Sequence, residues 1–478
     1  MSLISAPPSK VNNVKRDYVT LFNLNADDNA CRLIEPRSLH EVASDKYSPF
    51  VKMMQGLLVV DSDSDAVPCS KMDVVDINVT CAAEELIPHE IRASQGIFFT
   101  GDQIAEKIAL SLSEEISAGS SFFDPSCGAG NLLLAIAKSF PLKRSVLDTL
   151  DFWGKKFGGC DLSESFILAT KLRLIALALR RHGLQKVSRQ DLESYLRLFK
   201  SFEVADYLGT EFGADFDCIV ANPPFGHITA PDGVAWSSGK TQQAGVFIAQ
   251  ALMVAKSGQR IAAVLPDVLR SGTRYQKWRH MVEQNSADLH VDVYGQFSKT
   301  VDVDVFLLSV NVGAERRVDR VDNWQPTVRR VLDSCVKLNA LFEVRVGPVV
   351  PHRLSEKGKL VPYLTTHDAP PFSKVGRLPK INFGGTLYSP PFVVVRRTSS
   401  PSDKARLVPS LVQGRHSIAV ENHLIIIKPR DGSLKKCLEL IEEFKEERVA
   451  DWLNAVSRCR HLTTKILADI DIVRERYE

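Results

Sequence analysis

The sequence predicts an α/β protein in two folded parts, a mainly parallel sheet covered on both faces and then a smaller α+β domain. Two observations support this prediction. Between about residues 89 and 315, short apolar runs that suit strands alternate with longer stretches that suit helices. This alternation is typical of a parallel sheet with helices on both faces. From about residue 330, proline and glycine become frequent while strand-like runs continue, which indicates a second fold.

The expected elements follow in order along the chain. In the first part they are strands at 121–124, 157–161, 216–221 and 260–265, helices at 132–139, 165–181 and 247–256, and a closing hairpin of 291–294 with 303–310. In the second part they are strands at 392–397 and 423–429 and a helical tail from Leu434. The first 88 residues lack clear periodicity and contain an acidic run at 61–65, so we expect them to be irregular. The expected domains are therefore 1–88, 89–325 and 326–478.

Charge is distributed unevenly along the chain. The 478 residues are 44% hydrophobic and carry a net charge of only +3, so composition alone does not indicate a nucleic-acid binder. Between Arg345 and Arg415, however, twelve Lys and Arg stand against three Asp and Glu, a difference of 12 − 3 = +9. Such local asymmetry is typical of a phosphate-binding surface. A solvated basic face is the alternative.

Cysteine spacing and hydropathy exclude several other classes of protein. The nine cysteines are scattered singly, without a Cys-x-x-Cys pair or a Cys/His cluster. Neither a metal site nor a disulfide framework is therefore predicted. No apolar run approaches the roughly 18 residues that a membrane span needs, and the first residues lack the layout of a secretion signal. We expect a cytoplasmic protein with no membrane partner.

Residues 124–131 (Asp-Pro-Ser-Cys-Gly-Ala-Gly-Asn) stand where the first expected strand ends and a helix begins. Glycines at this point let the backbone turn tightly and approach a ligand closely. The segment is not the GxGxxG fingerprint, which argues against a nicotinamide cofactor. Asp161 ends the next expected strand, where a carboxylate can accept hydrogen bonds from both hydroxyls of a ribose. Together they predict a nucleotide site, although each alone also suits an ordinary strand–helix turn.

The segment Asn222-Pro223-Pro224-Phe225 directly follows the expected strand 216–221. Two prolines fix their backbone torsions and remove two N–H donors, which leaves carbonyls free to accept hydrogen bonds. The Asn222 side-chain oxygen and the Pro223 carbonyl can then receive both hydrogens of a planar amino group, and Phe225 can stack on its ring. This arrangement suits a base turned out of the helical stack. The alternative is a proline-rich turn without a chemical role.

These motifs resemble those of the N6-adenine DNA methyltransferases, above all the modification subunits of type I restriction systems and stand-alone type II methyltransferases. The likeness runs from about Gln95 to Val312. GIFFT at 96–100 is similar to the family's GxFFTP element, with Gly101 in place of the proline. DPSCGAG is similar to DPACGTG, and ADYL at 205–208 is similar to GDxL without its glycine. Phe297 and Thr300 stand where a late motif of the family helps to hold the target base.

The resemblance implies a Rossmann-like class I S-adenosylmethionine-dependent methyltransferase domain at 89–325 and an α+β target-recognition-like domain at 326–478, and it leaves the role of 1–88 unassigned. The implied cofactor-binding residues are Phe98, Phe99, Thr100, Asp124, Pro125, Cys127, Gly128, Gly130, Asn131, Asp161, Leu162, Asp206 and Tyr207. The implied catalytic residues are Asn222, Pro223, Pro224 and Phe225. Asp191 competes with Asp206 for the contact to the cofactor's adenine, and no metal is implied.

The implied reaction is site-specific transfer of a methyl group from S-adenosylmethionine to N6 of an adenine flipped out of double-stranded DNA. Because the sulfonium already activates the methyl carbon, the expected work is alignment, which can supply roughly 7–11 kcal/mol of a barrier. No covalent nucleophile is needed, so Cys127, Cys160 and Cys218 are interpreted as small buried packing residues. The expected role is the modification component of a restriction-modification or related defence system, with a specificity or restriction subunit as partner.

Two other methylation substrates and one non-catalytic function stay open at this point. Asn-Pro-Pro-Tyr/Phe also occurs in enzymes that methylate RNA bases or a glutamine amide, because those groups also present a planar nitrogen. A DNA-binding homologue without catalysis is the remaining class. Among DNA methyltransferases, cytosine N4 enzymes usually carry Ser in place of Asn222, and C5-cytosine enzymes require a Cys nucleophile after a proline. Adenine is therefore the favoured target.

Overall fold

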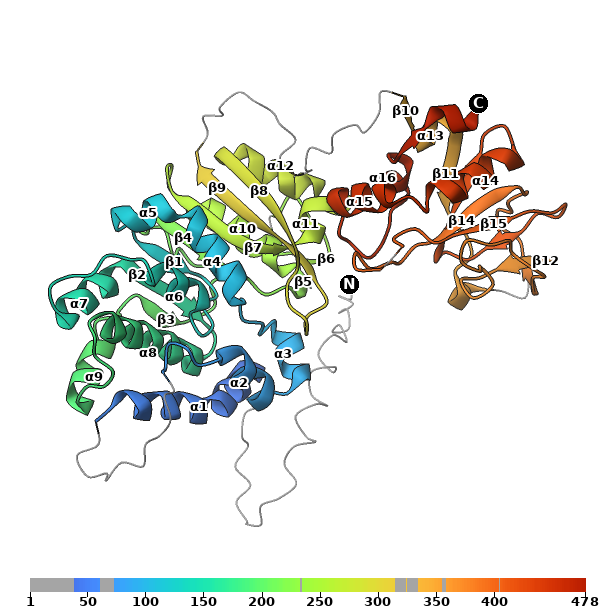
Figure 1. Ribbon diagram of the computed structural model, residues 1–478. Coiled ribbons are helices and arrows are strands. Elements are labelled where there is room, and N and C mark those ends of the chain that lie inside the picture. Colours follow the sequence, from blue (N-terminus) through green and yellow to red (C-terminus); the bar gives the residue numbers. More distant parts are fainter. Residues whose placement is uncertain are drawn as a thin grey trace, which may run out of the picture.

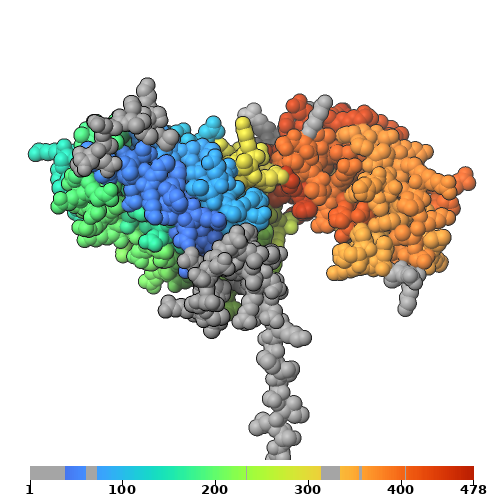
Figure 2. Space-filling view, turned by 90° about the horizontal axis from the view of Figure 1, so that it is seen from below, coloured from blue at the N-terminus to red at the C-terminus, as the bar shows by residue number. Residues whose placement is uncertain are grey.

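The computed structural model describes residues 38–60, 73–232, 234–313, 324, 334–354, 358–403 and 405–478 (Figure 1). The acidic run at 61–65 and the expected domain boundary at 325/326 lie outside these residues. Residues 38–313 form the larger body, called the N-terminal body below, and residues 334–478 form the C-terminal body beside it (Figures 1 and 2). Among the described residues, no helix combines the length and hydropathy needed to span a bilayer.

A seven-stranded sheet lies at the centre of the described N-terminal body, in the order β3-β2-β1-β4-β7-β9-β8. Its strands are β1 (Phe122–Asp124), β2 (Phe157–Asp161), β3 (Phe202–Val204), β4 (Cys218–Ala221), β7 (Arg260–Pro266), β8 (Ser286–Gln296) and β9 (Asp304–Val312). The first five run parallel, whereas β9 is antiparallel to both β7 and β8. The predicted parallel sheet with a closing hairpin is thus confirmed, and the fold class is α/β.

The central strands are buried on both faces because successive side chains point to opposite sides of the sheet. On β4, Cys218 and Val220 enter the core on one face, and Ile219 and Ala221 enter the core on the other. Helices of the first face include α4 (Asp102–Ser111), α5 (Ser113–Ala118), α6 (Asn131–Ala137), α7 (Val146–Lys156), α8 (Glu164–Arg181) and α9 (Arg189–Leu196). The second face is covered by α10 (Gln243–Val254), α11 (Asp267–Ser271) and α12 (Gln276–Gln284).

The largest departure from the sequence prediction lies before residue 88. Residues 38–60 were expected to be irregular, but α1 (Leu39–Leu58) is a 20-residue helix. Ser38 and Glu41 form a capping box at its start, a recognised helix-initiating arrangement. The buried residues of α1 recur at helical spacing: Ala43, Tyr47, Val51, Met54 and Leu58. α2 (Val79–Leu86) and α3 (His89–Gln95) follow, so the expectation of irregular structure was wrong here.

Other boundaries shift by a few residues. The helix expected at 247–256 begins earlier, at Gln243, and the strand expected at 216–221 begins later, at Cys218. Between them a short hairpin of β5 (His227–Thr229) and β6 (Lys240–Gln242) was not predicted. Its strands are only 3 residues long, too short for an alternating pattern to be read.

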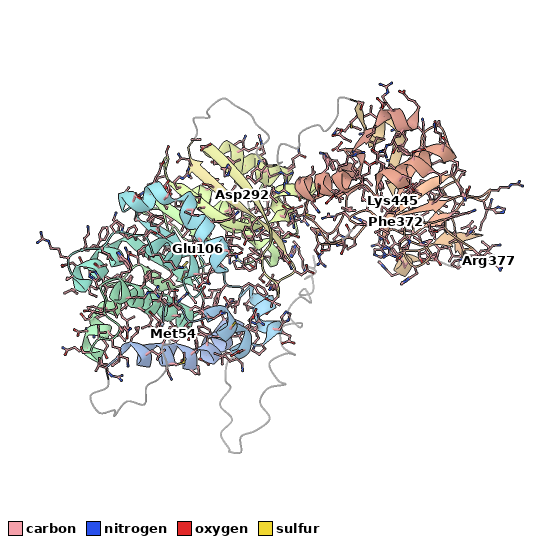
Figure 3. The ribbon with its side chains drawn as sticks, viewed as in Figure 1. Met54, Glu106, Asp292, Phe372, Arg377 and Lys445 are labelled. Carbon is pink, nitrogen blue, oxygen red and sulfur yellow. The ribbon has the colours of Figure 1, made fainter. Side chains whose placement is uncertain are left out.

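The described C-terminal body is α+β. A four-stranded antiparallel sheet contains β11 (Phe342–Val346), β17 (Leu424–Pro429), β14 (Phe392–Arg396) and β15 (Pro409–Val412), in that order. Smaller sheets pair β13 (Lys380–Phe383), β12 (Lys359–Leu364) and β16 (Ala419–Val420), and β10 (Cys335–Lys337) with β18 (Asp471–Val473). The helices are α13 (Leu338–Leu341), α14 (Leu434–Glu443), α15 (Glu447–Val456) and α16 (Thr464–Ala468). In Figure 3, Arg377 lies at the outer edge of this body.

The segment after α15 joins the two bodies. Arg458 forms an ion pair with Asp304, Nε to Oδ1 at 2.7 Å, and Arg460 forms a second one with Asp302. The Arg458 N–H also donates to Asp267 of α11, at 2.9 Å. Buried Arg406 supports the segment from the C-terminal side by donating to the carbonyls of Ser457 and Cys459.

Candidate active site

Three segments that are far apart in the sequence meet at one edge of the sheet. β1, β2 and β4 are parallel, so their carboxyl ends lie at the same edge, where open α/β sheets bind ligands. The Ser126 hydroxyl donates to the Asn222 carbonyl at 3.2 Å. The Asn222 side-chain Nδ2 donates to the Phe98 carbonyl at 3.1 Å. The segments 96–100, 124–131 and 222–225 are thereby tied into one site.

The glycine-rich turn adopts backbone conformations that favour glycine. Gly128 has φ 52° and Gly130 has φ 82°. A Cβ on Gly128 would stand 2.8 Å from the Phe99 ring, and one on Gly130 would stand 2.8 Å from Thr170. Both are closer than carbon atoms tolerate, so the turn brings its backbone against its neighbours as only glycine permits.

Helix α8 holds this turn from the inside of the protein. The Thr170 hydroxyl donates to the Gly128 carbonyl at 2.8 Å. The buried Arg173 guanidinium donates to the Ala129 carbonyl and to the side-chain oxygen of Asn131. Asn131 in turn donates to the Thr100 carbonyl at 2.6 Å. The turn is therefore rigid before any ligand binds, which is the arrangement that positions a ligand precisely.

A cavity of about 270 Å³ opens between these segments. Every residue predicted to bind the cofactor lines it except Gly130, which faces Thr170 instead. Of the four residues predicted to be catalytic, Asn222 and Pro224 line the cavity, whereas Pro223 and Phe225 do not. The cavity walls that the sequence did not predict include His40, Gln95, Phe166, Gln243 and Phe247. No local motif marks these residues, because long-range packing brings them together.

Two acidic side chains, Asp124 and Asp161, stand at strand ends that border the cavity. Asp161 accepts from the N–H groups of Gly128 and Ser163, each at 3.0 Å. Burial raises the pKa of Asp161 to about 6, and these backbone donors limit the rise. Asp124 is 2% exposed. Burial raises its pKa to about 8, partly offset by the Ser126 N–H, and the nearby Asp161 charge raises it further.

Of the two candidates for the adenine contact, Asp206 lines the cavity and Asp191 does not. β3 pairs with β2 such that Val204 lies opposite Asp161, so Asp206 emerges at the same sheet edge and lines the cavity. Asp191 instead exchanges hydrogen bonds with Ser188 in the first turn of α9 and does not line the cavity.

Asn222, which lines the cavity, has one side-chain atom without a partner. Its Nδ2 is engaged by the Phe98 carbonyl, whereas its Oδ1 is buried and has no hydrogen-bond partner among the described residues. Tyr207 also lines the cavity, and its hydroxyl is likewise buried without a hydrogen-bond partner among the described residues. Leaving a buried polar atom without a partner costs about 1–3 kcal/mol. Such atoms are therefore expected to meet a ligand.

The family model of N-6 DNA methylases matches residues 88–321. Over these residues the chain belongs to the N-6 DNA methylase family. Among curated protein sequences, none matches this chain.

Several solved structures resemble the chain at low identity. The type IIL restriction-modification enzyme MmeI, solved in complex with DNA, is 12% identical over 81% of this chain and 69% of its own, with a TM-score of 0.48. The type IIG restriction endonuclease BpuSI is 13% identical over 90% of this chain and 70% of its own, with a TM-score of 0.42. A modification subunit of a putative type I restriction enzyme from Vibrio vulnificus YJ016 is 17% identical over 50% of this chain and 51% of its own, with a TM-score of 0.34.

In this N-6 DNA methylase, the Phe225 ring packs edge to face on Phe297. Their centroids are 5.3 Å apart and their planes meet at 79°. Phe297 begins the loop 297–303, which is closed by its N–H donating to the Val303 carbonyl at 2.8 Å. Thr300, expected to help hold the target base, donates to Glu84 of α2 at 2.9 Å.

The three cysteines nearest the methylase site are buried, as predicted. Burial is the main cause that raises the pKa of the Cys127, Cys160 and Cys218 thiols, so they stay protonated at neutral pH. A protonated buried thiol is a poor nucleophile. Among the described residues, no cluster of His, Cys, Asp or Glu is suited to hold a metal ion.

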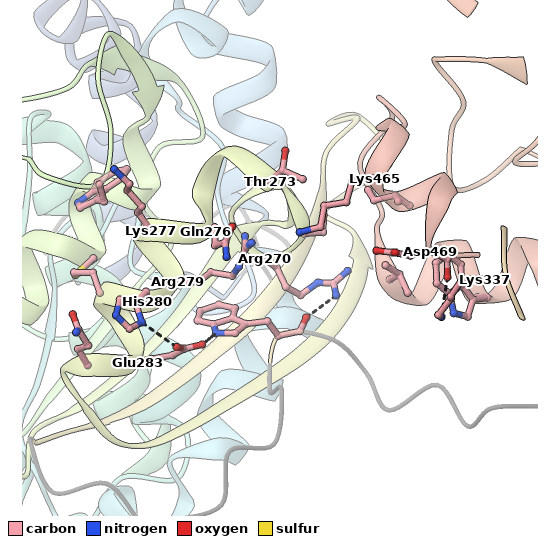
Figure 4. A pocket seen from close by; sticks show the side chains of 18 of the residues that line it. Arg270, Thr273, Gln276, Lys277, Arg279, His280, Glu283, Lys337, Lys465 and Asp469 are labelled. Atoms are coloured by element: carbon pink, nitrogen blue, oxygen red, sulfur yellow. Dashed lines mark hydrogen bonds and ion pairs between the residues drawn. The ribbon is translucent and has the colours of Figure 1, made fainter. Parts of the chain in front are cut away.

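A larger cavity, of about 1250 Å³, lies between the two bodies (Figure 4). Its lining from the N-terminal body includes Arg270, Thr273, Gln276 and Lys277, and its lining from the C-terminal body includes Lys465. It shares no lining residue with the cavity at the methylase motifs. Volume alone does not identify an active site, and the smaller cavity is the one that the family's motifs line.

Proposed function

We propose that this N-6 DNA methylase binds S-adenosylmethionine in the cavity lined by residues 98–100, 124–131 and 161–162, and holds the target adenine at residues 222–225. The observation that carries the proposal is the free Asn222 Oδ1, a buried acceptor on a residue that lines the cavity where the three motifs meet. An amino group is a natural partner for an acceptor that has none in the protein.

The residues of the cavity fit S-adenosylmethionine. Asp161, with both oxygens already oriented by backbone donors, is placed to accept from the ribose hydroxyls, and Asp206 to accept from the adenine amino group of the cofactor. Phe98, Phe99 and Thr100 would hold the methionine end. Bound there, the cofactor supplies an electrophilic methyl group on a sulfonium.

The chain's own contribution is to grip and orient the target amine. Asn222 Oδ1 and the Pro223 carbonyl would accept the two N6 hydrogens, which draws the nitrogen lone pair out of conjugation with the ring. The amide cannot rotate freely, because its Nδ2 is bound to the Phe98 carbonyl. Phe225, supported by Phe297, would stack on the flipped base. The proton leaves the nitrogen after transfer, so no general base is required.

The C-terminal body suits a DNA-recognition role. Most of the basic side chains between Arg345 and Arg415 point to solvent, among them Arg353, Lys374, Arg377, Lys380, Arg396 and Arg415. Exposed Arg and Lys side chains are the usual contacts to DNA phosphates. Arg406 differs from these, since it is buried and supports the junction. We infer that this body reads the target site and that the protein modifies DNA in a restriction-modification or related defence system, with a specificity or restriction subunit as partner.

Methyl transfer from labelled S-adenosylmethionine to DNA, RNA and protein in parallel tests the proposal. Label should enter double-stranded DNA as N6-methyladenine, and Asn222→Ala should slow this transfer by about 10²–10³-fold while cofactor binding persists. Label in RNA or in a protein glutamine would overturn the choice of substrate. Cofactor binding without transfer to any substrate would favour a DNA-binding homologue.

A further inference from the structure

Helix α1 lies against the first turn of α8, directly behind the expected ribose-binding residue. The Ser165 N–H donates to the Ser44 hydroxyl at 3.1 Å, and the Ser165 hydroxyl donates to the Ser44 carbonyl at 2.7 Å. Figures 1 and 2 show α1 running along this side of the N-terminal body. Figure 3 labels Met54, a buried residue of α1, where this helix packs on the rest of the N-terminal body. These contacts fix α1 relative to the end of β2.

An aromatic side chain of α1 also supports the cavity wall. Tyr47, which is fully buried, packs on Phe166 with 5.0 Å between ring centroids and on Phe99 with 6.3 Å. Phe99 and Phe166 are themselves 5.1 Å apart and both line the cavity. Phe99 is the ring that closes over Gly128. The aromatic face of the cavity is therefore built partly from α1.

One residue of α1 reaches the cavity directly. His40, in the first turn of the helix, lines the cavity together with Gln95 of α3, whose side chain is close enough to influence the imidazole. Its imidazole lies near the Asp206 carboxylate. Burial lowers the pKa of His40, although Asp206 and Gln95 oppose the change. A half-buried ring whose neutral form is favoured by burial thus lies near the expected adenine-binding carboxylate.

We propose that α1 forms one wall of the cofactor pocket and that His40 is a cofactor-binding residue, contacting the adenosine part of S-adenosylmethionine beside Asp206. The inference rests on the proposed function. It adds a residue from outside the segment that matches the family model, 88–321. A neutral imidazole suits this position because it can pack on a purine face or donate one hydrogen bond without adding charge next to the sulfonium cofactor.

A purely structural role for His40 is the competing explanation, since it also contacts Gln95. The two roles differ in what a substitution changes. A structural residue would lower the stability of the ligand-free protein, whereas a cofactor-binding residue would weaken ligand binding in a protein of normal stability. The matched control is His89→Ala, because His89 is an exposed histidine at the start of α3 and does not line the cavity.

Calorimetric titration of the ligand-free full chain tests the proposal, with S-adenosylmethionine, S-adenosylhomocysteine and 5′-methylthioadenosine as probes. These share the adenosine part but differ at the sulfur and the amino-acid end. We expect His40→Ala to raise Kd for all three by a similar factor, about 3- to 10-fold, which is the value of one contact of this kind. His89→Ala should bind as the wild type does, and the unfolding midpoint of both variants should match the wild type.

Three results would overturn the proposal. Unchanged Kd values in His40→Ala would remove His40 from the pocket. A loss confined to S-adenosylmethionine would place His40 at the sulfonium rather than at the adenosine. If the wild type binds none of the probes, the proposed function itself fails, and this inference fails with it. Should His40→Ala unfold, His40→Leu, which fills the same space without a polar group, takes its place and is judged by the same Kd values.

Discussion

Asp304 at the start of β9 and Arg458 after α15 form an ion pair across the junction of the two bodies, with 2.7 Å between Oδ1 and Nε. Their side chains are only 14% and 24% exposed. Asp304 directly follows the loop 297–303, whose Phe297 supports Phe225. The C-terminal body is thus attached to the segment that borders the proposed target-base site, so a shift of this body would reach Phe225.

Breaking this pair should weaken the junction. Asp304→Asn removes a charged hydrogen bond, and we expect a loss of about 1.5–3 kcal/mol in a double-mutant cycle with Arg458→Gln, measured by denaturant unfolding. The KM for DNA should rise while cofactor Kd stays constant. Asp151→Asn is the control, since the Asp151–Lys155 pair is exposed and should contribute less than about 1 kcal/mol. Additive effects of the two junction substitutions would contradict the coupling.

The second prediction concerns Asn222. Replacing it by Ala removes the acceptor for the target amine, and we expect kcat to fall by about 10²–10³-fold, by analogy with the loss of one preorganised polar contact. Cofactor Kd should change little, because no predicted cofactor contact is removed. Single-turnover methylation with labelled cofactor measures the effect. Asn222→Ala with wild-type kcat would rule out the proposed role of the side chain.

The third prediction concerns Gly96, where α3 meets the catalytic segment. Gly96 has φ 68°, and a Cβ there would stand 2.5 Å from the Pro224 Cβ. Gly96→Ala should therefore displace residues 222–225 and lower both stability and kcat. Gly101→Ala is a matched control in the same segment, because its Cβ would meet no atom within 4 Å. Thermal unfolding and methylation rates of the two variants should differ clearly; equal effects would show that the contact with Pro224 is unimportant.

The fourth prediction concerns pH. The pKa of Asp161 in the folded protein is about 6, above its ordinary value of 3.8, so the carboxylate accepts ribose hydroxyls fully only above about pH 7. Cofactor affinity should fall as the pH drops through 6 and be about tenfold weaker at pH 5. Asp161→Asn should bind more weakly and lose this dependence between pH 5 and 7. Asp191→Asn, outside the cavity, should keep the wild-type profile in calorimetric titrations.

The fifth prediction concerns the stacking ring. Phe225→Ala should reduce capture of the flipped base by about 1–3 kcal/mol, seen as weaker binding of DNA that carries the target adenine. Phe297→Ala should give a smaller loss in the same direction, because Phe297 acts by supporting Phe225. Fluorescence of 2-aminopurine at the target position reports the flipping. Full flipping in Phe225→Ala would show that another group holds the base.

Local chemistry explains what the sequence could predict. Strand ends, glycines with positive φ and prolines after a strand are encoded within a few residues, so the sheet and most of the cavity residues were foreseeable. The position of Phe225 against Phe297 depends on how the β8–β9 loop folds back, and no short pattern encodes it. The choice of Asp206 over Asp191 as a lining residue follows from the register of β3 on β2. The sequence did not predict α1, although its capping residues Ser38 and Glu41 could be recognised. Its place in the fold depends on packing against α8, which is far away in the sequence.

If Asn222 holds the target base as proposed, the hydrogen bond from its amide to the Phe98 carbonyl also selects which bases can bind. Because this bond holds Nδ2 against the Phe98 carbonyl and leaves Oδ1 as the atom without a partner, a keto oxygen such as guanine O6 or thymine O4 placed at Oδ1 would meet it lone pair against lone pair. Bases of that kind would be repelled at the mouth of the pocket before any sequence is read. Discrimination between amino and keto edges would thus be set by one backbone carbonyl more than a hundred residues upstream.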